Sequence, residues 1–355
     1  MKRGKMFYLS MVLAMAAAMI LSSFSAATAD PAKYASLKPM TLLYPHTSPK
    51  TEANALMADL IKKYAEAETG GKLTIEVMPA AQLGTAQETA QQLQDGSVNI
   101  SSEQVYSMVD FIPEVSVFDM LFMFSTYDKN TIDKTLNSGP VNKFLQERYN
   151  KAGFQLLGYM QGATFRETTS NRKLNGPADF KGMKIRTLPS NNFVVGWKAM
   201  GTAPTPITIG ELYLSLQQKL VEAQENPYDI ILSNNFNEVQ KYLCATHHNL
   251  YIMHVVMNKK FYDSLPKEYR EALELAVKKA RTEIGGSMPQ LAENSKKELL
   301  KRGMTLIEYD NKTFDQLRAS AKPQWDSIRK IAGNQVVDLM VKELNANSKK
   351  KSFTG

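Results

Sequence analysis

Hydrophobic and polar positions along this chain switch between two periods, one typical of strands and one typical of helices. The stretch MTLLYP, from Met40, predicts a strand, and the segment 48–71 then carries apolar residues at helical spacing and ends at two glycines. A second strand-like stretch, KLTIEVMP, follows directly. Because strands and helices that alternate in this way are typical of parallel crossover connections, the pattern predicts an α/β fold.

The pattern continues through the first half of the chain. TAQETAQQLQDG predicts a helix that ends at Asp95 and Gly96, and SVNISSEQ predicts the next strand. The apolar run VSVFDMLFMF extends the expected core. FQLLGYM and TFRETTS then predict two strands, at which we expect the chain to cross into a second lobe.

The second half predicts that lobe and a return to the first one. KGMKIRTLPS, KLVEAQENP, NLYIMHVVMN and MTLIEYD are strand-like, and helical spacing is present in NNFVVGWKAMG, GELYLSLQQ, FNEVQKYL, the segment 267–302 and two final helices around 314–344. Strands that pass back and forth between two lobes predict a hinge with an interlobe cleft. The predicted division is 30–163 plus 252–291 for lobe I, 164–251 plus 292–347 for lobe II and its C-terminal helices, and 348–355 for a polar tail.

The first residues predict a secretory signal. Lys2, Arg3 and Lys5 precede an uncharged apolar run from Met11 to Leu21, and small residues at 27–29 offer a cleavage site. The run is too short for a membrane-spanning helix, so residues 1–29 are predicted to be a signal peptide cleaved near Ala29. No cysteine follows the run, so no lipid anchor is expected.

The composition predicts a large hydrophobic core and argues against nucleic acid as a partner. The chain is 43% hydrophobic, and its one cysteine, Cys244, permits no internal disulfide and is expected to be a buried residue in the helical stretch around it. The formal charge of +8 falls to +5 without the signal, which holds three basic residues and no acidic one. The basic residues are scattered, apart from Lys349–Lys351 in the tail, and this distribution does not predict a nucleic-acid surface.

Residues that carry catalytic chemistry are sparse. The chain has four histidines and lacks the GxSxG, HExxH, GxGxxG and P-loop patterns. His247 and His248 form the only histidine cluster, and because no carboxylate lies at metal-ligand spacing, solvated or capping histidines are favoured over a metal site. His46 follows the strand MTLLYP, at a strand end where ligands bind in α/β folds, although an ordinary loop histidine is favoured. No cofactor or metal is expected.

Arg186 is the strongest candidate for a binding residue. It lies in a strand that runs into a proline-containing loop, which carries it toward the carboxyl end of the strand, where ligands of open α/β sheets bind. Its planar guanidinium matches a carboxylate in two parallel hydrogen bonds. The alternative, a structural ion pair with a helix carboxylate, is favoured on spacing alone.

Several motifs in order make the chain similar to a known family. RETTSNRKL, ADFKGMKIRTLPS, WKAMGTAPTPITIGELYLSLQ and VEAQENP, with AAQLG earlier, resemble the DctP-type solute-binding proteins of tripartite ATP-independent periplasmic (TRAP) transporters, over most of the mature chain. The resemblance implies that Arg186 forms a salt bridge with the substrate carboxylate. It also implies that Arg166 assists the substrate or orders the site, and that Asn226 contacts the ligand.

The resemblance extends more weakly to other positions. Glu103 falls where some relatives place a polar side chain near the distal part of the ligand; it would accept from a ligand hydroxyl or pair with Arg166 in the empty protein, and a solvated loop carboxylate is an equal alternative. Tyr228 follows the motif proline and would stack on an organic ligand, although packing is favoured. Relatives usually have Asp-Gly where this chain has Glu222 and Ala223, which predicts an altered turn before Asn226. Ile209 replaces the phenylalanine of sialic-acid-binding relatives.

Together these features predict a periplasmic receptor. It would bind a small organic acid between two α/β lobes and deliver it to TRAP membrane subunits, without catalysis, as a monomer or weak dimer. A secreted enzyme acting on an acidic substrate, or a binding protein that serves an ABC transporter or a sensor kinase, are the alternatives. The sequence does not select one organic acid.

Overall fold

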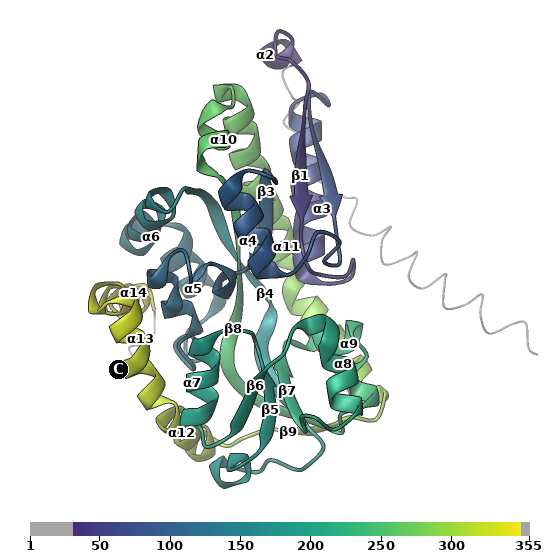
Figure 1. The fold of residues 1–355 in the computed structure, drawn as a ribbon, viewed down its shortest axis with the longest axis vertical. Coiled ribbons are helices and arrows are strands. Elements are labelled where there is room, and N and C mark those ends of the chain that lie inside the picture. The colour runs from purple at the N-terminus through teal and green to yellow at the C-terminus, as the bar shows by residue number, and fades with distance from the viewer. Residues whose placement is uncertain (1–30, 349–355) are drawn as a thin grey trace, which may run out of the picture.

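Two long strands form the centre of the molecule and run through both of its lobes. The computed structural model describes residues 31–348, so the predicted signal peptide 1–29 and tail residues 349–355 lie outside the described residues. Figure 1 shows β4 (Phe154–Ser170) and β8 (Tyr242–Asn258) side by side along the long axis, with helices around both ends. The two-lobed α/β prediction is confirmed.

The strands form two sheets. A parallel pair joins β1 (Met40–Pro45) to β2 (Leu73–Met78). The larger sheet has the order β3-β8-β4-β7-β5-β6, and β9 pairs with β8. Its remaining strands are β3 (Ile100–Gln104), β5 (Lys184–Thr187), β6 (Ala203–Pro206), β7 (Ala223–Asn226) and β9 (Thr305–Ile307).

Helices cover the sheets on both sides. In the first lobe they are α2 (Pro31–Tyr34), α3 (Ala53–Glu68), α4 (Ala86–Asp95), α5 (Lys129–Asn137), α6 (Gly139–Lys151) and α10 (Lys259–Ser264), with the 3-10 turns η1 (Val105–Met108) and η2 (Pro113–Asp119). Around the second lobe lie η3 (Pro177–Phe180), α7 (Asn191–Ala199), α8 (Ile209–Gln217), α9 (Tyr228–Ser233) and η4 (Phe236–Glu238). The C-terminal part consists of α11 (Lys267–Lys301), α12 (Asn311–Ser320), α13 (Lys322–Ala332) and α14 (Asn334–Asn347).

Helix α4 ends at Asp95 and Gly96, as the sequence predicted, and the structure adds a cap at its start. Thr85 accepts a hydrogen bond from the Glu88 backbone, Glu88 accepts one from the Thr85 backbone, and Gly96 ends the helix in the left-handed region. This reciprocal capping fixes the entry of α4 beside the cleft.

A glycine permits the two central strands to approach at the level of the cleft. A Cβ placed at Gly162 of β4 would lie 2.6 Å from Cδ1 of Tyr251 in β8, so no larger residue fits there. The register between the two strands also shifts between Gln161 and Phe165. The strands are therefore irregular where the two lobes meet.

Helix α11 joins the cores of both lobes. Its first part contributes residues such as Leu273 and Ile284 to a cluster with β1, β2 and α3, whereas Leu299 near its end belongs to a cluster with α8 and α9. The residues from α13 and α14, including Ile328 and Met340, pack into the core beneath α5 and α6 of the first lobe. The exact lobe boundaries remain a prediction.

Four details of the predicted elements were wrong. FNEVQKYL is not a helix, because η4 ends at Glu238 and β8 begins at Tyr242, where pairing with β4 and β9 fixes an extended backbone. Cys244 is buried, as predicted, but in this strand. FQLLGYM and TFRETTS are parts of the one strand β4, and three helices follow β9 instead of two.

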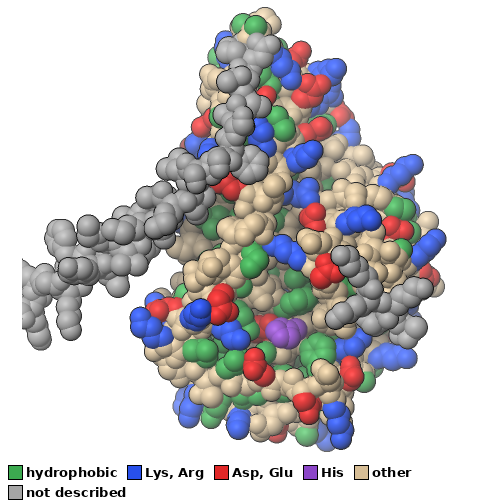
Figure 2. All heavy atoms as spheres, turned by 180° about the vertical axis from the view of Figure 1, so that it is seen from behind, with side chains coloured by type: hydrophobic (Ala, Val, Ile, Leu, Met, Phe, Trp, Pro, Cys, Tyr) green, Lys and Arg blue, Asp and Glu red, His purple; other side chains and the backbone are tan. Residues whose placement is uncertain are grey.

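The surface carries both signs of charge. Figure 2 shows Lys and Arg side chains interspersed with Asp and Glu on the face that it draws. None of the helices within 31–348 is both long enough and apolar enough to span a membrane.

Candidate functional site

A cavity of about 430 Å³ lies where the two lobes meet, a size typical of small-molecule sites. Its walls come from both lobes: the first lobe contributes the starts of α3 and α4 and the end of β3, and the second contributes β5, β7 and the starts of α8 and α9. The charged and aromatic residues on its walls are Glu52, Glu88, Glu103, Tyr106, Arg166, Arg186 and Tyr251.

Strand β5 directs Arg186 into this cavity. Neighbouring Ile185 packs into the apolar core of the second lobe, and because successive strand side chains point to opposite faces, Arg186 points the other way. The side chain is 1% exposed, and its Nε donates to the Ile207 carbonyl at 2.8 Å. Its Nη1 lies 3.9 Å from Glu225 Oε1 and has no hydrogen-bond partner within residues 31–348.

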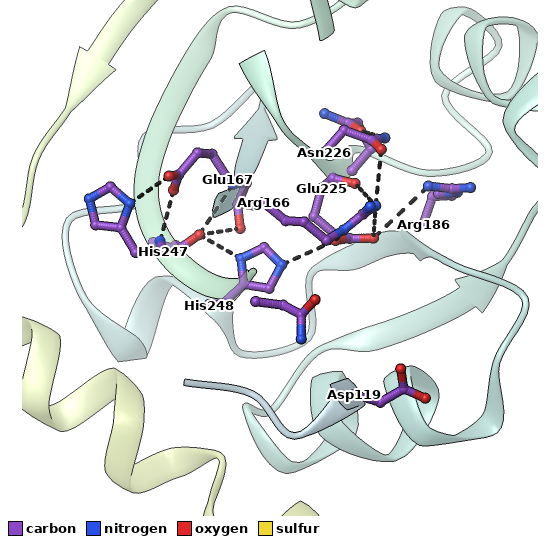
Figure 3. Close-up of polar contacts among 12 residues, drawn as sticks. Asp119, Arg166, Glu167, Arg186, Glu225, Asn226, His247 and His248 are labelled. Atoms are coloured by element: carbon purple, nitrogen blue, oxygen red, sulfur yellow. Dashed lines mark hydrogen bonds and ion pairs between the residues drawn. The ribbon is translucent and has the colours of Figure 1, made fainter. Parts of the chain in front are cut away.

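Arg166, in contrast, is held on every side by the protein. Its Nε and Nη2 donate to the Glu225 carboxylate, its Nη1 donates to Gln104 Oε1 at 3.0 Å, and its Nη2 also reaches Asn226 Oδ1 at 3.0 Å. Figure 3 shows Arg166 and Arg186 approaching Glu225 from two sides. Arg166 therefore orders the cavity wall with donors that are already engaged.

Glu225 is the ionised centre of this group. Burial alone would raise its pKa, but Arg166 and His248 outweigh burial and lower the pKa to about 2. His248 Nε2 lies 3.1 Å from Glu225 Oε2, and His248 Nδ1 bonds with Thr246 Oγ1 at 2.8 Å. Desolvation lowers the pKa of Arg186 to about 10, which leaves its guanidinium charged at neutral pH.

The expectation of solvated or capping histidines was wrong for His248 and not for His247, whose side chain is 43% exposed. His248 is fully buried against Glu225, and His247 bonds with Glu167, whose Oε1 lies 2.5 Å from His247 Nδ1 (Figure 3). Across residues 31–348 no group of three or more His, Cys, Asp or Glu side chains is arranged to hold a metal ion.

Asn226 ends β7 on the cavity wall and is 2% exposed. Its Oδ1 accepts from Arg166, and its Nδ2 donates to Gln224 Oε1 at 2.6 Å. Ala223 is an ordinary strand residue paired with Ile185, and the left-handed residue of the preceding turn is Lys219, with φ of 59°. The Glu222-Ala223 sequence thus enters β7 without a positive φ.

Glu103 is the last residue but one of β3, lines the cavity from the first lobe and is 5% exposed, so it is not a solvated loop residue. It accepts from the Thr47 backbone N–H at 2.7 Å and from Thr47 Oγ1 at 2.8 Å. The pairing with Arg166 does not form, because the donors of Arg166 go to Glu225, Asn226 and the neighbouring Gln104. Burial raises the pKa of Glu103 to about 7, although Thr47 opposes this.

Glu52 was not predicted from the sequence. It precedes α3, is 4% exposed, and its Oε1 accepts from Ser233 Oγ at 2.7 Å and Asn234 Nδ2 at 3.0 Å across the cleft. Burial raises its pKa to about 7. An acidic residue at a helix start is common, so the sequence held no distinct signal for this position. Tyr251, in the middle of β8, was also missed, because aromatic residues are common in strands.

The other two predicted residues do not reach the cavity wall. His46 is 1% exposed behind the end of β1, with its ring edge against Tyr44. Tyr228 packs with Leu212 and Leu299 in the apolar cluster of the second lobe. We therefore do not propose that His46 or Tyr228 contacts the ligand.

Comparison with known proteins shows the same family as the motifs. Residues 44–331 match the bacterial extracellular solute-binding protein family 7. A solute-binding protein of Verminephrobacter eiseniae is 30% identical over 253 residues, 70% of this chain and 74% of that protein. The 2,3-diketo-L-gulonate-binding periplasmic protein of Escherichia coli is 27% identical over 314 residues, 87% of this chain and 89% of that protein.

A solved structure shows the same fold. The sugar acid binding protein from Advenella mimigardefordensis, in complex with galactonate, superposes with a TM-score of 0.82 over 88% of this chain and 99% of that chain, at 22% identity.

Proposed function

This chain belongs to the bacterial extracellular solute-binding proteins of family 7, the DctP family, and on that premise we propose that it binds a small organic acid through Arg186 and delivers it to the membrane subunits of a TRAP transporter. The observation that carries the proposal is the buried guanidinium of Arg186: the residue lines the cavity, and its Nη1 has no hydrogen-bond partner among residues 31–348. A buried cationic donor of this kind is completed by an anionic acceptor from outside.

The charges at this end of the cavity favour an anion. Glu225 is the carboxylate nearest to both arginines, and it is engaged by Arg166 and His248. Two guanidinium groups therefore share one carboxylate, and one positive charge remains uncompensated. A ligand carboxylate on Arg186 would neutralise it in a desolvated setting, where charge-assisted hydrogen bonds are strong. Arg166 and Asn226 would fix the position of the wall against which the carboxylate rests.

Contacts between the lobes support a closed state that the ligand stabilises. Gln87 Nε2 at the start of α4 donates to the Pro189 carbonyl after β5 at 3.0 Å, and Asn192 Nδ2 of α7 donates to Asp119 Oδ2 at 2.9 Å. A ligand that contacts both lobes binds the closed state more tightly than the open one and so shifts the population toward closure. The membrane subunits of the transporter would bind the surface that the two lobes form in the closed state. We place the protein in the periplasm after cleavage near Ala29, as a monomer or weak dimer.

A secreted enzyme is the second candidate, because Glu52 and Glu103 have pKa values of about 7 on the cavity wall, as a general acid or base requires. The family consists of substrate-binding receptors, and we propose that the ligand leaves unchanged. Incubating the protein with each bound acid and following the acid by NMR separates the two candidates, since turnover would favour the enzyme.

The test of the proposed function uses residues 30–355, freed of carried-over ligand by partial unfolding. A panel of organic acids is screened by thermal shift, because a ligand that binds the folded state raises the melting temperature. We expect one class of carboxylate to give a large shift that is lost in Arg186→Ala and kept in Arg172→Ala, whose arginine is 42% exposed on the surface. A shift with neutral or cationic solutes alone, or an unchanged shift in Arg186→Ala, would contradict the proposal.

Delivery to a TRAP transporter is tested with the membrane subunits. Uptake of the bound acid into vesicles that contain TRAP membrane subunits should require the purified protein. Uptake through an ABC permease in their place would favour the alternative.

A further inference from the structure

The cavity has a second pole, on the walls that the first lobe contributes, and it is acidic. Glu52 and Glu103 both line the cavity, and both are at least 95% buried. Burial raises the pKa of Tyr251, and the charges of Glu52 and Glu103 raise it further, whereas the charge of Arg166 lowers it. Tyr251 lies over Arg166, with the guanidinium carbon 5.9 Å from the ring centre. The two poles thus belong to one site with Tyr251 between them.

The protein gives this acidic pole neutral partners. Glu103 is held by Thr47, and Glu52 by Ser233, Asn234 and Ser48. Within residues 31–348 neither carboxylate forms a salt bridge with Lys, Arg or His, in contrast to Glu225 at the other pole. Asp229, 6% exposed at the start of α9, adds a further negative charge that acts on Glu52. Buried carboxylates without a cation are costly, and groups with hydrogen atoms to donate relieve that cost.

From this arrangement we propose that the ligand is a carboxylate whose far end presents N–H or O–H donors and carries no second carboxylate, and that Glu103 and Glu52 select that end. The inference rests on the proposed function, because it assumes that the near end binds Arg186. Hydroxy acids and amino acids of suitable length share this chemistry.

The free acceptor capacity of the pole fits donors. A carboxylate has about four lone-pair positions. Glu103 receives two hydrogen bonds, both from Thr47, and Glu52 receives two on Oε1 from Ser233 and Asn234 and also interacts with the Ser48 side chain. Further positions on both side chains are available to a ligand in the cavity. Hydroxyl or ammonium groups would fill them, whereas a methyl end would leave them dehydrated and unfilled.

The same charges act against a second carboxylate. It would meet the two buried glutamates and the nearby Asp229 at a place without an arginine, and like charges brought together without water repel strongly. The raised pKa values of Glu52 and Glu103 agree with this, because each shows how poorly the empty pole tolerates negative charge. Because Glu52 comes from the first lobe and bonds with α9 of the second, a ligand donor there would also strengthen closure.

A matched set of acids tests the proposal by isothermal titration calorimetry at pH 7. Hexanoate, 6-hydroxyhexanoate, 6-aminohexanoate and adipate differ only at the far end, and gluconate and glucarate make the same comparison between a hydroxyl and a carboxylate on a polyhydroxylated chain. We expect the hydroxyl or amino compounds to bind at least tenfold more tightly than adipate and hexanoate, and gluconate more tightly than glucarate. Whichever of the hydroxyl and amino compounds binds more tightly identifies the donor.

Variants assign the selection to the two glutamates. In Glu103→Gln and Glu52→Gln the preference for the donor compound over adipate should fall at least tenfold, since the glutamine amide keeps the shape and removes the charge. Glu76→Gln, at an exposed position of β2 outside the cavity, is the matched control and should keep the wild-type preference.

The outcomes separate this inference from the proposed function. Tight binding of adipate that depends on Arg186 would overturn the inference alone, as would a preference that both glutamine variants retain. If no carboxylate binds the wild type, or if binding survives in Arg186→Ala, the proposed function fails together with the inference.

Discussion

The two poles of the cavity shift the pKa of a buried glutamate in opposite directions. At the arginine pole, Glu225 is surrounded by Arg166 and His248, and its pKa falls to about 2. At the acidic pole, Glu103 is buried to a similar degree but meets only the neutral donors of Thr47, and its pKa rises to about 7. Burial raises the pKa in both cases, so the partner decides the direction of the shift.

This difference indicates what each pole does. The arginine pole is an ordered frame in which the protein satisfies most of its own charges and leaves Arg186 for the ligand. The acidic pole is incomplete, because neutral donors do not fully compensate its carboxylates. We infer that a ligand supplies an anion to one pole and hydrogen-bond donors to the other.

The strongest test of the comparison removes the carboxylate at the centre of the arginine pole. Glu225→Gln leaves Arg166 and Arg186 buried without their shared counter-charge, and we expect it to lower the free energy of unfolding by about 3 to 5 kcal/mol. Chemical denaturation of the ligand-free protein measures this. Glu222→Gln, 40% exposed nearby, should change stability by less than about 0.5 kcal/mol. Equal effects of the two variants would show that Glu225 is not a structural centre.

Arg186→Ala should act on binding more than on folding. We expect the binding free energy of the cognate acid to weaken by about 2 to 5 kcal/mol, because the ligand carboxylate loses its buried partner. The stability of the empty protein should stay equal or increase, since a desolvated charge is removed. Calorimetry with parallel denaturation measures both quantities. A loss of affinity below about tenfold would place the ligand carboxylate elsewhere.

The acidic pole predicts a pH dependence of stability. The Glu103 carboxyl releases its proton near pH 4.5 in the unfolded chain and near 7 in the folded one. Between these values the folded state binds more protons, so stability falls as pH rises from about 4.5 to about 7. In Glu103→Gln this decline should be smaller by on the order of 2 to 3 kcal/mol.

Thermal and denaturant unfolding of the ligand-free protein across this range provides the measurement. Glu52 and Asp119, which also have pKa values of about 7, should maintain part of the decline in the variant. An unchanged slope would mean that Glu103 titrates normally.

The smallest effect is expected when Glu103 loses one of its neutral hydrogen-bond donors. Thr47→Val removes the hydroxyl that donates to Glu103 at 2.8 Å, and we expect a loss of about 1 kcal/mol in stability and a further rise in the pKa of Glu103. Thr41→Val, an exposed substitution of the same kind in β1, should stay within about 0.5 kcal/mol. A loss as large as that for Glu225→Gln would remove the distinction between the poles.

Local signals in the sequence predicted much of the fold and one anchor of the site. The strand signal around β5 and the proline after it placed Arg186 near a strand end, and Asp95 and Gly96 placed the end of α4. Such features depend on neighbouring residues, so the sequence contains them directly. The family motifs added Arg166 and Asn226, which the structure brings to the same wall.

Predictions were wrong where distant segments decide the outcome. The stretch 236–243 has helical spacing, yet β4 and β9 pair with Tyr242 and Leu243 and hold them extended. Tertiary hydrogen bonding and burial of this kind outweigh a weak local propensity.

The sequence by itself determined the alternating elements of an α/β chain, the family, and a buried arginine at the end of a strand. Only the tertiary structure decided that Arg166 is engaged by Glu225, that Glu103 meets Thr47, and that Glu52 faces the same cavity from 134 residues away along the chain from Arg186. The reason is physical: the charge state and role of a buried group depend on its partners in space, and those partners come from strands and helices far apart in the chain.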